Sequence, residues 1–214
     1  MEDNEILQVW KNYDRKLEEN LLLSRQNARA ITSLKVHSFL SSMKPIKIFT
    51  IAAGILWVGF LDFLIVNLFH IASPYFLVSA IILSLLNKLA IGIYLYQLIL
   101  IHQADITEPV IATQEKIARL KSSTLWVARL LFLQLPLWTI FYWNKTMLLN
   151  GSAVLLTIQA LVTGVFIFAA CWLFINIRYS NRNKKWFGLI FNGKEWSPLM
   201  KSMELLSQLE EFKK

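Results

Sequence analysis

Four long apolar runs constrain the fold of this chain more than any other feature of its sequence. They cover approximately Ile46–Phe69, Tyr75–Ile101, Leu125–Trp143 and Ser152–Ile177. Each is long enough to cross a hydrocarbon core of about 30 Å, which takes about 20 helical residues. The chain has 214 residues, of which 56% are hydrophobic and only 17% are charged. This composition excludes an ordinary water-soluble domain. The sequence therefore predicts an all-α polytopic membrane protein with four transmembrane helices.

Lysine and arginine are distributed unevenly around these runs. The segments before the first span, between the second and third, and after the fourth are rich in both, whereas the two short connections contain only Lys145. Loops that carry excess Lys and Arg stay in the cytoplasm, so both termini are predicted to be cytoplasmic. The net charge of +8 follows from the same bias. We expect the lipid bilayer as a partner, and no nucleic acid.

Three parts follow from this topology. Residues 1–45 form a cytoplasmic amphipathic helix that ends at Pro45. Residues 46–177 form a four-helix transmembrane bundle with a cytoplasmic helical segment over 102–124. Residues 178–214 form an interfacial segment and a C-terminal amphipathic helix. Long cytoplasmic helical extensions are thus expected on one side of the membrane, with almost nothing on the other.

The first part carries an apolar stripe. Its members recur in steps of three and four, which is the spacing of one helical face: Ile6, Trp10, Tyr13, Leu17 and Leu21. An amphipathic helix must cover such a face. The sequence leaves three possible covers open, namely the other cytoplasmic helices, a partner, or the bilayer surface. We take the stripe as a candidate partner-binding face.

Each apolar run also contains polar residues at depth. They form a predicted intramembrane polar layer: Asp62, Ser84, Asn87, Lys88, Gln134, Thr157, Gln159 and Thr163. A charge inside the bilayer is costly and usually pairs within the protein interior. The first two runs are joined by a tight turn, so an ion pair between Asp62 and Lys88 is expected. Such a pair either fixes helix register or belongs to an ion path or switch.

No pattern in the sequence indicates catalysis. The three histidines lie on different segments, and the single cysteine, Cys171, lies inside an apolar run. A metal site needs more ligands than these segments bring together. No phosphate-binding glycine loop occurs. We expect no enzyme activity, no catalytic residue, no metal site and no cofactor.

Two stretches resemble a family of small bacterial four-span membrane proteins. These are "WKNYDRKLEENLLLSR" (Trp10–Arg25), which contains W-x-x-x-D-x-K-L-E, and "DITEPVIATQEKIARLKSSTL" (Asp105–Leu125), which contains D-x-x-x-x-V-x-x-x-Q-x-K. "LQLPLW" (Leu133–Trp138) adds to the likeness. Some members are encoded beside extracytoplasmic-function sigma factors. The resemblance implies a bacterial inner membrane location and a role in transmembrane or sigma-factor-linked signalling.

Two functions fit these features. The first is an integral membrane interaction or regulatory protein that presents cytoplasmic helices to a protein partner or to another copy. The alternative is an oligomeric channel or transporter subunit that uses the intramembrane polar layer.

Overall fold

The computed structural model describes residues 2–103, 110–191, 193 and 196–211, and in these residues the regular structure is entirely helical. The long helices are α1 (Glu2–Ser42), α2 (Lys44–Leu68), α3 (Pro74–Gln103), α4 (Val110–Leu133) and α7 (Ala153–Asn176). The short ones are α5 (Leu135–Ile140), α6 (Lys145–Asn150), α8 (Lys185–Phe191) and α9 (Ser197–Glu211), with a 3₁₀ turn η1 at Tyr179–Asn181.

Four helical stretches of the described chain are long and apolar enough to cross a membrane. They are Trp10–Leu68, which joins α1 to α2, then Pro74–Gln103, Ala112–Ile140 and Ala153–Asn176. The predicted all-α class is confirmed, and these four helices indicate a membrane protein.

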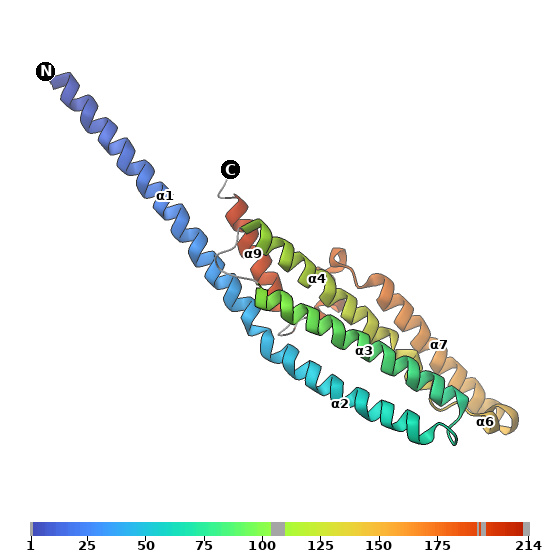
Figure 1. Ribbon diagram of the computed structural model, residues 1–214. Helices are drawn as coiled ribbons and strands as arrows, with labels where there is room; N and C mark the ends of the chain where they lie inside the picture. Colours follow the sequence, from blue (N-terminus) through green and yellow to red (C-terminus); the bar gives the residue numbers. More distant parts are fainter. Residues whose placement is uncertain (1, 104–109, 192, 194–195, 212–214) are drawn as a thin grey trace.

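The spans pack side by side in a row. In the described residues, α2 packs on α3, and α3 packs on both α4 and α5. Helices α4 and α5 in turn pack on α7. The helices α2 and α7 thus form the two edges of the row (Figure 1). Gly54 permits a close approach of α2 to α3, since a Cβ atom there would lie 3.1 Å from Cγ1 of Ile91. Within the described ranges, each edge helix has a broad face that stays exposed.

Proline residues mark two breaks in the long helices. Pro45 separates α1 from α2, and Pro136 follows the break between α4 and α5 at Gln134. Proline has no N–H group and clashes with the preceding turn, so it interrupts the hydrogen-bond ladder.

At the far end of the row, the hydroxyl of Ser73 donates to the carbonyl oxygen of Trp143 at 3.0 Å. This hydrogen bond ties the α2–α3 turn to the segment before α6.

The main hydrophobic core lies at the opposite end of the row. It joins the C-terminal part of α1 to the ends of α3 and α4 and to α8 and α9, and its buried members include Leu40, Ile101, Leu120, Phe187 and Leu199. Apolar side chains within the spans are mostly exposed, because lipid replaces protein as their neighbour. The core therefore stabilises the part of the chain next to the spans, and α1 extends away from it (Figure 1).

Candidate functional site

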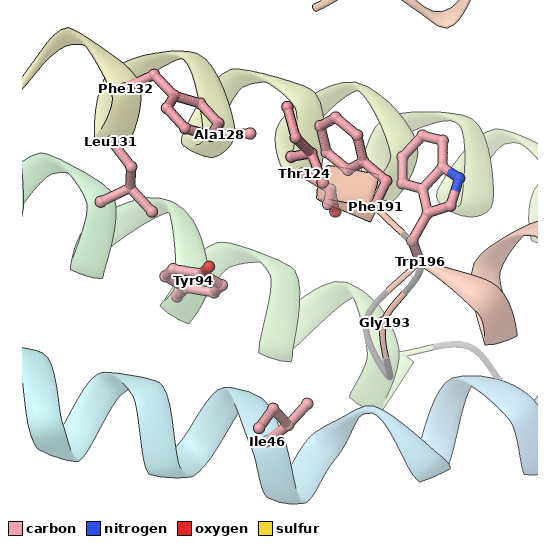
Figure 2. Close-up of a pocket in the computed structure, with 10 residues that line it drawn as sticks. Ile46, Tyr94, Thr124, Ala128, Leu131, Phe132, Phe191, Gly193 and Trp196 are labelled. Atoms are coloured by element: carbon pink, nitrogen blue, oxygen red, sulfur yellow. The ribbon is translucent and has the colours of Figure 1, made fainter. Parts of the chain in front are cut away.

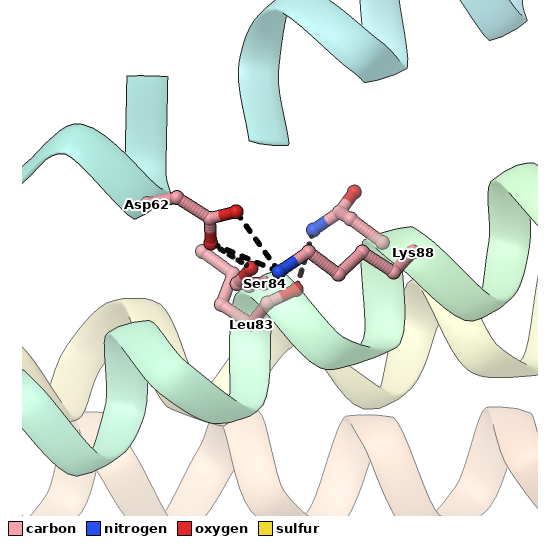
Figure 3. A network of polar contacts seen from close by, with 5 residues as sticks. Asp62, Leu83, Ser84 and Lys88 are labelled. Atoms are coloured by element: carbon pink, nitrogen blue, oxygen red, sulfur yellow. Dashed lines mark hydrogen bonds and ion pairs between the residues drawn. The ribbon is translucent and has the colours of Figure 1, made fainter. Parts of the chain in front are cut away.

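Asp62 on α2 and Lys88 on α3 meet in the structure. The ammonium of Lys88 lies 2.9 Å from Oδ2 and 3.1 Å from Oδ1 of Asp62. The hydroxyl of Ser84 donates to the same Oδ1 at 2.6 Å. Asn87 takes no part, because its amide donates to the carbonyl of Leu83 at 2.7 Å. Figure 3 shows the Lys88 ammonium and the Ser84 hydroxyl next to each other, both facing the Asp62 carboxylate. The site is a neutral ion pair with one supporting hydroxyl.

The pair was predicted to lie in the interior of the protein, but it does not. The side chains of Lys88 and Asp62 are 50% and 43% exposed, and only Ser84 is buried. Asp62 is six residues from the end of α2, or about 9 Å along the helix axis, well inside its apolar stretch. A single charge at bilayer depth costs about 2.5–3.5 kcal/mol on insertion scales. The pair is neutral, but half of its surface faces the space that lipid or another protein occupies.

The other polar side chains of the predicted layer are not joined to this pair. The amide of Gln159 on α7 donates to the carbonyl oxygen of Thr139 on α5 at 2.8 Å. Gln134 and Thr163 are buried, and neither Nε2 of Gln134 nor Oγ1 of Thr163 has a hydrogen-bond partner in the described part of the chain. Thr157 donates to the carbonyl of Ala153 in its own helix. In the described part of the chain, the layer is thus divided into separate groups along the row, with no continuous path among them.

A second polar group, which was not predicted from the sequence, is centred on Lys47. This lysine of α2 and Gln97 of α3 are both 0% exposed, and Nζ of Lys47 donates to Oε1 of Gln97 at 2.5 Å. The same Nζ lies 4.9 Å from the centre of the Tyr94 ring, within range of a cation–π interaction. Tyr94 and Gln97 share one face of α3 because they are three residues apart. That spacing was the available signal, but Lys47 lies near the start of its span and resembles an interfacial lysine.

Beside this group lies a cavity of about 430 Å³ between α2, α3, α4 and the chain around α8. Figure 2 shows the side chains that line it, among them Ile46, Tyr94, Phe132, Phe191 and Trp196. Most of its lining is aliphatic or aromatic. Such a cavity suits an apolar group.

The predicted partner-binding face lies mostly in the described chain. Trp10, Tyr13, Leu17 and Leu21 are 50–66% exposed on α1, while the side chain of Ile6 lies outside the described residues. In contrast, the end of α1 near the spans is covered, with Val36, Leu40 and Met43 buried in the main core. The N-terminal part of α1 thus carries an apolar stripe that no described part of the chain covers.

Comparisons with protein families, with curated proteins and with solved structures give no match to this chain.

Proposed function

We propose that the protein is a membrane-anchored interaction protein whose N-terminal helix binds a cytoplasmic protein partner. The observation that carries this proposal is the exposed stripe of Trp10, Tyr13, Leu17 and Leu21 on a helix that projects from the rest of the chain. Aromatic anchors spaced over two to three helical turns are typical of helix-in-groove recognition. Large exposed apolar side chains in a row mark interaction sites more often than isolated ones do.

The proposed location is the inner membrane of a bacterium, with α1 and α9 in the cytoplasm. The short connections at the α6 end carry one basic residue, Lys145, whereas the opposite end carries most of the Lys and Arg. The positive-inside rule assigns the basic end to the cytoplasm. The resemblance to four-span proteins encoded near sigma factors supports a partner in transcriptional signalling.

The charged residues of α1 favour a protein, rather than the bilayer, as the surface that binds this apolar stripe. Residues 2–19 contain six acidic and three basic side chains, whereas residues 20–43 contain three basic and no acidic ones. An anionic membrane surface attracts basic segments, so the acidic end of α1 gains little by lying on it. Two α1 helices laid side by side along this stripe would bring their acidic ends together. A partner with a basic, amphipathic helix is complementary to the stripe.

Replacing Trp10 and Leu17 together by serine is expected to weaken binding of this partner at least tenfold. Truncation of a central aromatic anchor alone commonly costs that much. The matched control replaces Lys11 and Glu18 by serine, because these residues have the same spacing on the neighbouring polar side of α1. Photo-crosslinking from position 13 in cells identifies the partner, and titration of its purified helix measures the affinity. Cross-links to lipid or to a second copy only, or equal affinities of both variants, would contradict the proposal.

The second candidate is an oligomeric channel or transporter subunit. The exposed position of Asp62 and Lys88 favours a polar route between copies over one through a single copy. For this candidate, liposomes that contain the purified chain should conduct ions, and Asp62→Asn should change the ion selectivity while the helical circular dichroism is retained. Absence of flux from every oligomer that forms would exclude it.

A further inference from the structure

The ion pair at the edge of the row leaves a charged surface without a described neighbour. Both partners are about half exposed, and both lie on helices that cross the membrane. In hydrocarbon no water hydrates the exposed half of such a pair, so charged side chains in spans face protein or a water-filled cavity. The exposed part of the Asp62–Lys88 pair therefore indicates a missing neighbour.

We propose that the exposed face of α2 and α3 around Asp62 and Lys88 binds the same face of a second copy within the membrane. This inference does not depend on the proposed function, which concerns α1 outside the spans. Its occupant is a second copy because the surface carries one anion and one cation at the same depth. Under a two-fold axis along the membrane normal, such a surface is complementary to itself. The ammonium of each copy then faces the carboxylate of the other, and the four charges sum to zero.

Two glycines beside the pair support close contact at this face. Gly59 precedes Asp62 by three residues and Gly92 follows Lys88 by four, so each lies one helical turn from a charged residue. A Cβ atom added at either glycine would meet no atom within 4 Å in the described chain. Packing within one copy therefore does not require them. Small residues at membrane helix interfaces let backbones approach closely.

The test uses disulfide cross-linking of the full chain in native membranes. Cys171 is first replaced by serine, which removes the single native thiol. One cysteine is then placed at Leu85, which is 59% exposed and one turn from Lys88, or at Leu161, which is 64% exposed on α7 at the other edge of the row. The Leu85→Cys chain is expected to form a covalent dimer, and the Leu161→Cys control only a background amount. Adding Asp62→Asn and Lys88→Met should lower the dimer yield about three- to tenfold, the range of polar contacts between membrane helices.

A second measurement needs no substitution in the face. The wild-type chain carries a fluorescent label on an added C-terminal tag and is diluted in liposomes. The fluorescence of a single labelled particle should then bleach in two steps rather than one. A monomer under these conditions would overturn the inference. Equal yields from positions 85 and 161 would overturn it too, as would cross-links from position 85 to a different membrane protein without any homodimer. Loss of α1 binding in the Trp10 and Leu17 variant leaves these outcomes unchanged, so the two proposals fail separately.

Discussion

Replacing Gln97 with leucine is expected to destabilise the protein by about 3 kcal/mol, more than replacing Lys47 with methionine. In the first variant the fully buried ammonium of Lys47 loses the carboxamide oxygen that accepts its hydrogen bond at 2.5 Å. Removing one partner of a buried charged hydrogen bond costs about 3–5 kcal/mol when the charge stays behind. In the second variant the charge itself is removed, and only the neutral amide of Gln97 loses its donor, which costs about 1–3 kcal/mol.

The double variant with Lys47→Met and Gln97→Leu should be less destabilised than the sum of the single variants. Replacing both partners by apolar groups of similar shape removes this hydrogen bond without leaving either of its ends behind, so the two effects are coupled. The free energy of unfolding in a mild detergent, measured by denaturant titration, gives all three values. Lys35→Met is the control, because Lys35 is exposed on α1 and its loss should change stability by less than about 0.5 kcal/mol. A larger loss for Lys47→Met than for Gln97→Leu would show that the buried charge does not depend on this acceptor.

The positions of the spans could be predicted because length and hydropathy decide them. The second span was predicted at Tyr75–Ile101 and is Pro74–Gln103, and the fourth was predicted at Ser152–Ile177 and is Ala153–Asn176. The third was predicted to continue to Trp143, but its helix stops at Ile140, after the break that Pro136 imposes. Backbone groups without water must pair within each segment, so a long apolar run has few alternatives to a helix.

The inward faces of the spans could not be predicted in the same way. In water an apolar side chain indicates the interior, but in lipid both sides of a helix are apolar. Leu56 of α2 is exposed and Leu83 of α3 is fully buried, although both are leucines in a span. The charged residues were therefore the main guide, and they pointed to the interior. Asp62 and Lys88 meet as expected, but they do so at the edge of the row. A charge in a span prefers protein around it, and this preference does not specify whether the same copy or another copy provides that protein.

The packing around Lys47 was missed for a related reason. A lysine near the start of a span usually extends its ammonium toward the headgroups. Here Pro45 turns α2 away from the axis of α1, and the buried Lys47 side chain meets Gln97 and Tyr94 on α3 instead. Near this turn α1 also packs on α9, and α9 packs on α4. Helix periodicity does not contain such tertiary contacts.

Phe187→Ala is expected to be the most damaging single substitution in the core that holds α1. The ring of Phe187 is 1% exposed and stacks on Phe191 with centroids 4.3 Å apart, while Trp196 lies edge-on at 5.6 Å. Truncating a buried phenylalanine costs about 3–5 kcal/mol, because the transfer energy is lost and a cavity remains. The same core contains Leu40 of α1 and Leu199 of α9.

The loss should loosen the contact of α9 with α1 before the spans unfold, because lipid or detergent still covers the spans. Limited proteolysis in detergent should then cut around α8 and α9 at least tenfold faster than in the wild type, while the helical content of the spans is retained. Leu189→Ala is the matched control, since Leu189 is in the same helix but 88% exposed, and its cleavage rate should stay near that of the wild type. Equal cleavage of both variants would mean that the aromatic cluster does not hold the C-terminal helix in place. A selective effect of Phe187→Ala would establish that the aromatic cluster of Phe187, Phe191 and Trp196 holds α9 in the core that it shares with α1.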